Sequence, residues 1–327
     1  KETPFFLYLS HFAVHDPIEG RKDLVKKYSN KLKGIDPPGG EPFILETNPD
    51  EKKSITRIEL DSLLEDNKYK GYKIFSNGSV KIKQHQDNVE FAGMVESMDE
   101  SLGRIMKKLK ELELDQNTVI IFYSDNGGMS AANFYFPDRE ISKKEIDKAF
   151  STSNLPLRGG KGWMYEGGIR VPLIIKWPGK GLQGVVSNVP VTSPDFFPTI
   201  LEMIGLEAEN NNQKEGISMV PLLKGDQKLE REAIYWHFPH YSNHGNQSPG
   251  GVIRSGDYKL LEYYENNTIQ LFNLAEDPGE QNDLSTKEPK RVNKLRLLLT
   301  NWRKNVNAKM MSPNSEYDAS AVIYESK

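Results

Sequence analysis

Two polar residues and two glycines follow an apolar run near the middle of the chain. Residues 119–123 are Val-Ile-Ile-Phe-Tyr, and Ser124 leads from them into Asp125, Asn126, Gly127 and Gly128. A carboxylate and a side-chain amide offer hard oxygen ligands for a metal cation, and glycine lets backbone approach a ligand closely. An Asx-Gly pair after a strand is also ordinary turn chemistry, so this segment alone has two interpretations.

A glycine-rich basic segment follows at residues 157–172. It contains Arg158, Lys161 and Arg170 together with several glycines. Such a loop can wrap closely around an anion, with Lys161 supplying a positive charge. The alternative for Lys161 is a solvated lysine in a loop. Arg158 and Arg170 are equally suited to pairing with acidic neighbours.

Histidines occur in two places. His11 and His15 lie at the end of an apolar run near the N-terminus, and a positioned imidazole can donate a proton to a leaving group. The second group is His237, His240 and His244. We interpret it as a rim that binds substrate, because aromatic rings stack on sugars and imidazoles hydrogen-bond hydroxyls. The alternatives are a histidine-rich turn packed on the core and, less favoured because of Pro239, a histidine-only metal site.

The apolar pattern predicts the elements that position these side chains. Continuous apolar runs predict buried, parallel strands at residues 5–12, 118–124 and 171–177. Apolar spacing predicts a helix at residues 94–112 and another at 196–204. This alternation predicts an α/β fold with a mainly parallel sheet, whose ligands bind beyond the carboxyl ends of the strands. Both the first histidine pair and the Asp-Asn pair fall at such ends, which favours one shared site.

The remaining sequence predicts an insertion and a second subdomain. Residues 16–87 read as an insertion, with a hairpin signal at Asn77-Gly78. A shift in composition divides the chain into a large domain at residues 1–225 and a subdomain at 226–327. The subdomain is predicted to be an antiparallel meander covered by a helix at residues 289–305. Its strands are predicted at 233–237, 251–254, 258–264 and 268–272, and Asp277-Pro278-Gly279-Glu280 reads as the turn between the last strand and the helix.

Composition excludes several classes of function. The 327 residues carry a net charge of −3 and no cysteine, so disulfides, thiolate metal sites and a cysteine nucleophile are excluded within this chain. No basic footprint suggests nucleic acid, and no apolar run approaches the roughly 20 residues of a membrane span. The chain lacks an initiator methionine and a signal-peptide pattern and starts at once on an expected strand. We therefore expect it to be part of a longer protein.

The motifs become specific in combination. The His-x-x-x-His-x-Pro segment at residues 11–17, the Ser-Asp-Asn-Gly-Gly segment at 124–128 and the glycine-rich segment at 157–172 resemble, in order and spacing, the formylglycine-dependent (type I) sulfatases. Residues 192–199 and 271–278 extend the resemblance, which covers the chain from residue 4 to about residue 305. It implies an alkaline-phosphatase-like α/β sandwich with a mainly parallel central sheet, plus a small C-terminal antiparallel sheet and helix.

The resemblance also implies roles for individual residues. Asp125 and Asn126 are similar to two ligands of the family's single divalent cation, usually calcium. Lys161 is similar to the lysine that contacts sulfate, and His15 to the histidine that binds sulfate and protonates the leaving alcohol. The implied substrate is a sulfated oligosaccharide or polysaccharide, and the implied location is periplasmic or secreted. Further substrate contacts are expected from His11, Arg158, His237, His240 and His244.

The sequence departs from the family pattern in three respects. The family's nucleophile is a formylglycine made in a Cys/Ser-x-Pro-x-Arg motif, and that motif does not occur in these 327 residues. The tandem aspartates of the metal site and a second Lys/His pair are also missing. Calcium takes about six to eight oxygens, so Asp125 and Asn126 alone should bind it poorly. We expect the N-terminal half of the same protein to complete the site and the isolated chain to be inactive.

Two other functions stay open on sequence alone. The first is a phosphoester, phosphodiester or phosphonate hydrolase of the same superfamily. Those enzymes typically carry Asp-His-Gly and bind zinc or manganese where this chain has Asp125-Asn126-Gly127, an all-oxygen pair suited to calcium. The second is a non-catalytic glycan-binding fragment, in which Lys161 and the Asp-Asn pair would have no purpose.

Overall fold

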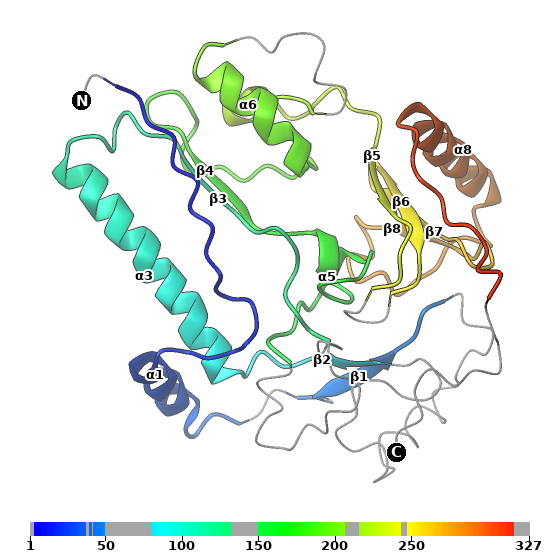
Figure 1. Ribbon diagram of the computed structural model, residues 1–327, viewed down its shortest axis with the longest axis horizontal. Helices are drawn as coiled ribbons and strands as arrows, with labels where there is room; N and C mark the ends of the chain where they lie inside the picture. Colours follow the sequence, from blue (N-terminus) through cyan, green and yellow to red (C-terminus); the bar gives the residue numbers. More distant parts are fainter. Residues whose placement is uncertain are drawn as a thin grey trace.

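Three small antiparallel sheets and several helices make up the part of the chain that the computed structural model describes, residues 3–36, 39–40, 42–49, 80–131, 150–206, 216–242 and 247–316 (Figure 1). The helices are α1 (Lys22–Leu32), α3 (Val89–Glu111), α5 (Glu166–Ile169), α6 (Phe196–Met203), α7 (Val220–Leu223) and α8 (Pro289–Asn305). The strands are β1 (Phe43–Glu46), β2 (Val80–Lys83), β3 (Ile120–Tyr123), β4 (Leu173–Lys176), β5 (Ile234–Phe238), β6 (Gly250–Ser255), β7 (Tyr258–Tyr263) and β8 (Ile269–Asn273). The predicted α/β class with a small C-terminal antiparallel sheet and helix is confirmed.

Strands β3 and β4 pair with each other in antiparallel register. Ile120 lies opposite Lys176 and Tyr123 lies opposite Leu173. The prediction that these two strands are parallel is therefore wrong. The chain leaves β3 and re-enters β4 at the same end of the pair, where Ser124 N donates to Pro172 O at 3.3 Å. This arrangement places the segment after β3 directly beside the segment before β4.

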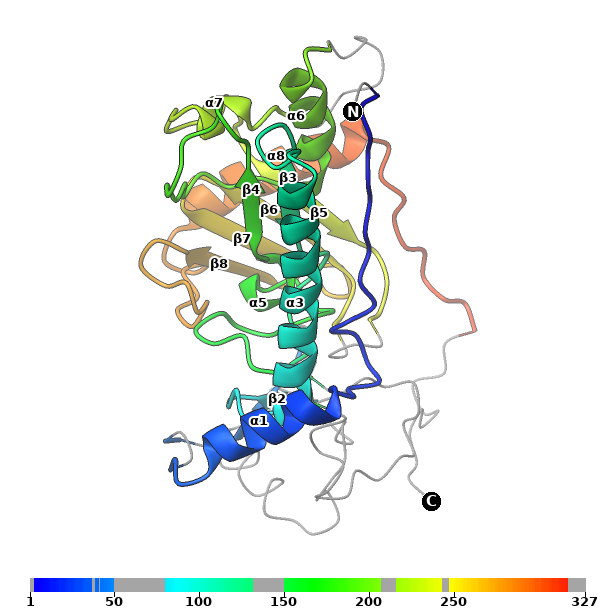
Figure 2. The same cartoon turned by 90° about the vertical axis from the view of Figure 1, so that its left-hand side faces the viewer.

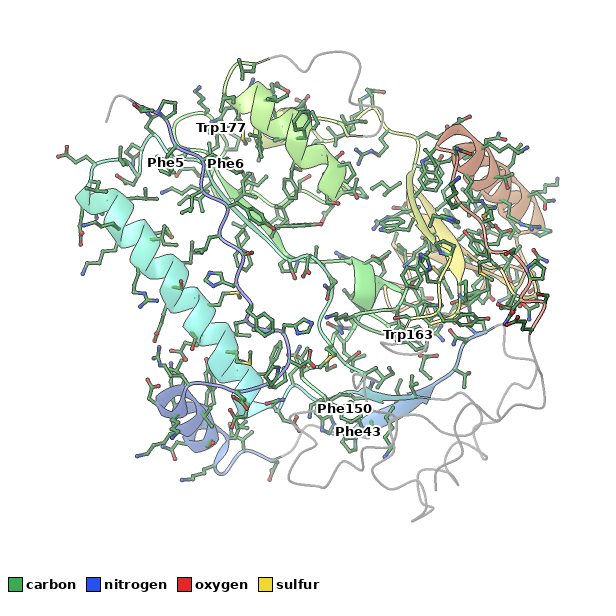
Figure 3. The ribbon with its side chains drawn as sticks, viewed as in Figure 1. Phe5, Phe6, Phe43, Phe150, Trp163 and Trp177 are labelled. Atoms are coloured by element: carbon green, nitrogen blue, oxygen red, sulfur yellow. The ribbon has the colours of Figure 1, made fainter. Side chains whose placement is uncertain are left out.

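The apolar run at residues 5–12 does not form the predicted buried strand. It is an open trace that runs from the N-terminus towards α1 (Figure 1). Phe6 is 77% exposed and Tyr8 is 81% exposed. A continuous apolar run suits a buried strand, but within the described ranges no strand pairs with this run, so its side chains stay in contact with water. Figure 3 labels Phe5 and Phe6 on this trace.

The predicted long helix is confirmed as α3. Asn88 caps its first turn, because its side-chain oxygen accepts a hydrogen bond from Phe91 N at 3.0 Å. Helix α1 lies across the lower end of α3 (Figure 2). Two ion pairs hold the helices together. Lys27 Nζ lies 2.5 Å from Glu96 Oε1, and Arg21, which directly precedes α1, pairs with Glu100. Apolar packing adds to these, since Leu24 of α1 is buried.

The expected insertion at residues 16–87 contains α1, β1 and β2 in its described parts. Strand β1 pairs antiparallel with β2, with Phe43 opposite Lys83. Strand β2 is bridged in turn to the segment after β3, through Ile82 and Ala131. The hairpin predicted at Asn77-Gly78 lies outside the described residues.

The C-terminal meander is confirmed, and its sheet is buried on both faces. Alternate residues of the strands point to opposite sides, so Ile253, Leu260 and Leu271 pack against helix α8. Their neighbours Val252, Leu261 and Phe272 pack against the aromatic end of the glycine-rich segment. This sheet is therefore the floor on which that segment rests. The contributing residues of the segment are Trp163, Met164 and Tyr165.

Helix α6 begins and ends as predicted. A capping box between Thr192 and Asp195 opens the turn before it, and Gly205, at a φ of +76°, follows its end. Asp195 is fully buried and forms an ion pair with Arg231. It also accepts a hydrogen bond from Ile217 N at 2.9 Å, which joins α6 to the chain that leads into β5. The division of the chain at residue 225 stays a prediction.

None of the helices in the described ranges combines the length and the apolar character that crossing a membrane requires.

Candidate functional site

The two residues predicted to be catalytic lie in contact, although 146 positions separate them. Lys161 Nζ is 2.7 Å from His15 Nε2. An ammonium can only donate, so Nε2 accepts and the remaining ring proton sits on Nδ1. That nitrogen faces Asp16, 2.9 Å from its backbone oxygen and 2.8 Å from Oδ1. The His15 side chain is 45% exposed, so the pair is open to a ligand from solvent.

The Asp125–Asn126 segment belongs to the same assembly. Gly127 N donates to Gly168 O at 2.9 Å, and Lys161 N donates to Gly128 O at 3.0 Å. The loop after β3 and the glycine-rich segment before β4 are thus joined through their backbones. Asp125 stands exposed at this edge and Asn126 is partly buried. The structure therefore brings the predicted metal ligands and the predicted sulfate-binding lysine onto one pair of loops.

Glycine is required where these two loops meet. A Cβ built on Gly127 would lie 1.8 Å from Gly167 O, and one on Gly168 would lie 2.1 Å from Trp163 O. The sequence suggested that the glycines let the loop wrap around an anion. In the structure Gly127, Gly167 and Gly168 pack against protein backbone instead. Because these glycines have no side chain, the two loops can approach each other closely. The glycines therefore position the loops and do not contact the ligand themselves.

Asn154 links the two loops, a positioning role that the sequence did not predict. Its Nδ2 donates to Gly128 O at 2.8 Å and to Gly159 O at 3.1 Å, while its Oδ1 accepts from Gly128 N at 3.1 Å. Ser130 Oγ adds a bond to Gly159 O at 3.0 Å. These side chains link the two loops at several points. An asparagine beside Leu155-Pro156 reads as an ordinary turn residue, so the sequence carries no distinct signal for this role.

Arg158 makes structural contacts. Its Nη2 lies 2.5 Å from Glu46 Oε1 and its Nε 3.1 Å from Glu46 Oε2, a two-point ion pair. Nη1 donates to Glu280 O at 2.9 Å, and the guanidinium sits 4.1 Å from the centre of the Tyr165 ring. The side chain is 17% exposed. These contacts tie strand β1 to the start of the glycine-rich segment, and substrate binding by Arg158 stays a prediction.

A buried group of charges supports the glycine-rich segment from below. Lys259 Nζ, fully buried in β7, lies 3.1 Å from Glu166 Oε1 and 2.8 Å from Glu280 Oε1. Glu280 Oε2 accepts a hydrogen bond from Glu166 N at 2.7 Å. Burial raises the pKa of the Glu280 carboxyl, and Lys259 offsets part of that effect by favouring the charged form. Residues 277–280 form the expected turn, but its last side chain points into the core.

The predicted histidine rim is only partly described. His237 has both ring nitrogens engaged, with Nδ1 2.7 Å from Tyr264 Oη and Nε2 2.7 Å from Lys309 O. His240 is exposed and its ring meets Phe238 edge-on, with the ring centres 5.6 Å apart. His244 lies outside the described residues. His11 is exposed on the N-terminal trace. Substrate contacts by these histidines stay predictions.

A calcium ion takes about six to eight oxygen donors. Within the described ranges no three His, Cys, Asp or Glu side chains come together as a metal site. Asp125 and Asn126 provide oxygen donors of the kind that calcium prefers. The donors fit the ion in type and supply only part of its coordination, as expected from the sequence.

Comparison with known proteins places the chain in a family. The model of the sulfatase family matches residues 1–206, and the model of the C-terminal region of N-sulphoglucosamine sulphohydrolase matches residues 160–305. A sulfatase of Formosa agariphila is 30% identical over 88% of this chain and 43% of its own length. An N-acetylglucosamine-6-O-sulfatase of Bacteroides thetaiotaomicron is 29% identical over 62% of this chain and 32% of its own length. The chain thus spans less than half of these relatives.

Solved structures agree with these matches. The crystal structure of Ps i-CgsB in complex with k-i-k-neocarrahexaose superposes with a TM-score of 0.64 at 24% identity, over 92% of this chain and 50% of that one. A protein bound to its substrate D-glucosamine-2-N,6-O-disulfate gives a TM-score of 0.53 at 26% identity, over 67% of this chain and 40% of that one. The fold is that of the alkaline-phosphatase-like superfamily. Within that superfamily, the chain belongs to the sulfatase family.

Proposed function

We propose that the protein hydrolyses a sulfuric ester and removes sulfate from a sulfated carbohydrate, in particular an oligosaccharide derived from a polysaccharide. The contact of His15, on the N-terminal segment, with Lys161 is the observation that supports this most directly, because the loop of Lys161 is joined through its backbone to the loop that carries Asp125 and Asn126. The relatives named as carbohydrate sulfatases support the class of substrate. The proposal concerns the whole protein, of which this chain supplies one part of the site.

Lys161 and His15 have separate tasks in this proposal. The Lys161 ammonium neutralises charge on the sulfuryl oxygens, where negative charge is concentrated during cleavage. A sulfate oxygen bound there competes with His15 Nε2 for the lysine protons. His15 is then free to take up a proton and to donate it to the departing sugar oxygen. The carboxylate of Asp16, 2.8 Å from Nδ1, orients the ring.

The metal and the nucleophile complete the proposed site. Asp125 and Asn126 are proposed to hold one calcium ion, which when bound supplies further positive charge for the sulfuryl oxygens. We propose that a formylglycine and the remaining metal ligands come from the N-terminal half of the same protein, since no Cys/Ser-x-Pro-x-Arg motif occurs in these 327 residues. A periplasmic or secreted location is part of the same proposal and rests on the resemblance to the family alone.

Metal content and product release in the purified whole protein test the proposal. We expect about one calcium per molecule and release of sulfate, but not of phosphate, from matched sulfated and phosphorylated sugars. Stoichiometric zinc with preferential release of phosphate would favour the phosphoester hydrolases of the superfamily. Glycan binding without calcium dependence and without turnover would favour a non-catalytic binder. Either result contradicts the assignment.

A further inference from the structure

Helix α1 and the residue that follows it carry a row of lysines for which the described residues show no acidic partner. Lys22 and Lys26 lie one turn apart on α1, and Lys33 directly follows its last residue. Together with Ser29 and Asn30 they line a groove with a volume of 390 Å³ beside the start of α3. Lys33 Nζ donates to Asn30 Oδ1 at 2.8 Å. Within the described ranges none of the three lysines is recorded in an ion pair.

Two basic residues explain how the helix is attached, Arg21 directly before α1 and Lys27 within it. The Arg21 guanidinium contacts Glu100 and Asp23, and Lys27 contacts Glu96 of α3. These pairs, with the burial of Leu24, account for the docking of α1 on α3. None of them involves a member of the row of three lysines. Like charges one turn apart disfavour a helix, and a cation in the first turn opposes the helix dipole, so folding alone gives no reason for this row.

The groove keeps a positive balance of charge. The single acidic residue in its lining is Glu90, and the backbone already uses that carboxylate: Oε2 accepts a hydrogen bond from Gly20 N at 2.7 Å. Three lysines therefore face one engaged carboxylate. A solvated lysine face on a convex surface would leave each ammonium separately hydrated. Here Lys22, Lys26 and Lys33 line one shallow, open groove, and such a spread of positive charge favours an extended polyanion over a single small ion.

The groove also lies close to the proposed site along the chain. Gly20 lines the groove and is only five positions from His15. A chain of five residues spans at most roughly 18 Å, so the two places are within reach of one oligosaccharide. Figure 1 shows the N-terminal trace leading directly into α1. A sulfated polysaccharide carries the repeated negative charges that such a groove would recognise.

We propose that the groove between α1 and α3 binds sulfate groups of a polysulfated glycan on sugars other than the one that is cleaved. This inference rests on the proposed function and deepens it, since it assigns a preference for long, multiply sulfated substrates. Lys22, Lys26 and Lys33 provide the charge, and Ser29 and Asn30 provide neutral hydrogen bonds.

The test compares two triple variants of the whole protein. In the first, Lys22, Lys26 and Lys33 are each replaced by Gln, which keeps helix propensity and removes charge. In the matched control, Lys107, Lys108 and Lys110 at the far end of α3 are replaced by Gln. With a rise of 1.5 Å per residue, that end lies roughly 25 Å from Glu90. We expect the first variant to raise KM for a multiply sulfated hexasaccharide about tenfold.

Three further readouts separate binding in the groove from a structural effect. With a monosulfated monosaccharide, kcat and KM of the first variant should match those of the unmodified protein. The rise of KM with salt for the hexasaccharide should be less steep in the variant, because fewer charges are screened. The control variant should behave like the unmodified protein. Equal KM values for the hexasaccharide in all three proteins, or equal losses on both substrates, would overturn the proposal.

Direct binding keeps this test independent of activity. Dextran sulfate, with unsulfated dextran as the blank, is titrated against the three proteins. We expect weaker binding by the first variant only. If the unmodified protein releases no sulfate from any substrate, the proposed function fails, while the titration still decides whether the groove binds sulfated chains. Undiminished binding of dextran sulfate by the first variant would contradict the groove even if hydrolysis is observed.

Discussion

At the scale of single residues, the hydrogen bond between Lys161 and His15 defines the starting state of the proposed chemistry. Lys161 Nζ can only donate, so at 2.7 Å His15 Nε2 is the acceptor of this hydrogen bond. A sulfate ester that takes over the lysine protons changes the hydrogen bonding of the histidine at the same moment. Binding of the substrate and preparation of the acid are therefore linked through one contact.

Lys161→Ala and His15→Ala should each lower sulfate release by the whole protein about 100-fold or more. The first removes charge stabilisation and the second removes the proton donor. Turnover of a sulfated sugar at saturating substrate measures both. Lys228→Ala, which changes an 81% exposed lysine, is the control and should leave turnover unchanged. Near-normal rates in both site variants would refute the roles assigned to them.

Gly127→Ala should separate the two loops and lower both stability and activity. A Cβ there would lie 1.8 Å from Gly167 O, which is backbone and cannot move aside cheaply. We expect a loss of about 1–3 kcal/mol, the usual cost of overpacking. Gly103→Ala in α3 is the matched control: nothing lies within 4 Å of its Cβ, and helix propensity predicts a gain of up to about 1 kcal/mol. Urea unfolding with an activity assay measures both, and equal behaviour of the two variants would contradict this account.

At the scale of elements, the C-terminal sheet supports the site from beneath. One face of the sheet packs on α8, and the other receives Trp163 and Tyr165 from the glycine-rich segment. Lys259 extends from β7 to the carboxylates of Glu166 and Glu280, which fixes α5 to the sheet. Helix α5 in turn carries Gly167 and Gly168, on which the Asp125 loop rests. The subdomain therefore has a positioning role as well as its predicted role in the rim.

Lys259→Met should destabilise the protein by about 3–5 kcal/mol, because it leaves the buried carboxylate of Glu280 without a cation and that of Glu166 with Arg254 alone, 3.6 Å away. Lys228→Met removes the lysine of an exposed pair with Glu230 and should leave the unfolding midpoint unchanged. The triple variant Lys259→Met, Glu166→Gln, Glu280→Gln should recover part of the loss, since no charge then stays buried alone. Thermal unfolding measures all three. A small effect of Lys259→Met, or no recovery in the triple variant, would show that the charges do not hold α5 in place.

The sequence predicted local features well and pairing poorly. The helices at α3, α6 and α8 and the meander follow from apolar spacing and turn residues, which act over a few positions. The antiparallel pairing of β3 with β4 depends on contacts between distant segments, and a continuous apolar run looks the same in either direction. The same limit explains why Asn154 and Lys259 were missed. Their partners lie far along the chain, and neither stands in a recognisable motif.

At the scale of the whole molecule, apolar side chains on several elements face solvent. Phe6 and Tyr8 on the N-terminal trace, Ile174 on β4 and Val186 in the following loop are between 65% and 90% exposed. Exposed apolar side chains mark an interaction face where they form a contiguous patch. This exposure agrees with the proposal that further parts of the protein, which this chain does not span, complete the site.

Hydroxyl-radical footprinting should distinguish the chain from the whole protein. Phe6 and Tyr8 are expected to be modified several-fold more slowly in the whole protein, because burial removes access of the radical. Leu297 on α8, which is 61% exposed, serves as the internal control and should react equally in both. Equal modification of Phe6 and Tyr8 in the two samples would contradict the view that this surface is covered.

The direct backbone contact between the Asp125 loop and the glycine-rich segment has a consequence for protein engineering. Because main-chain atoms hold the reactive groups at fixed spacing, variation in surface side chains leaves that spacing intact. Libraries that aim to retarget the protein to new sulfated sugars should therefore randomise the α1 groove and residues 237–242. Libraries that randomise residues 127, 167 and 168 should yield few folded members.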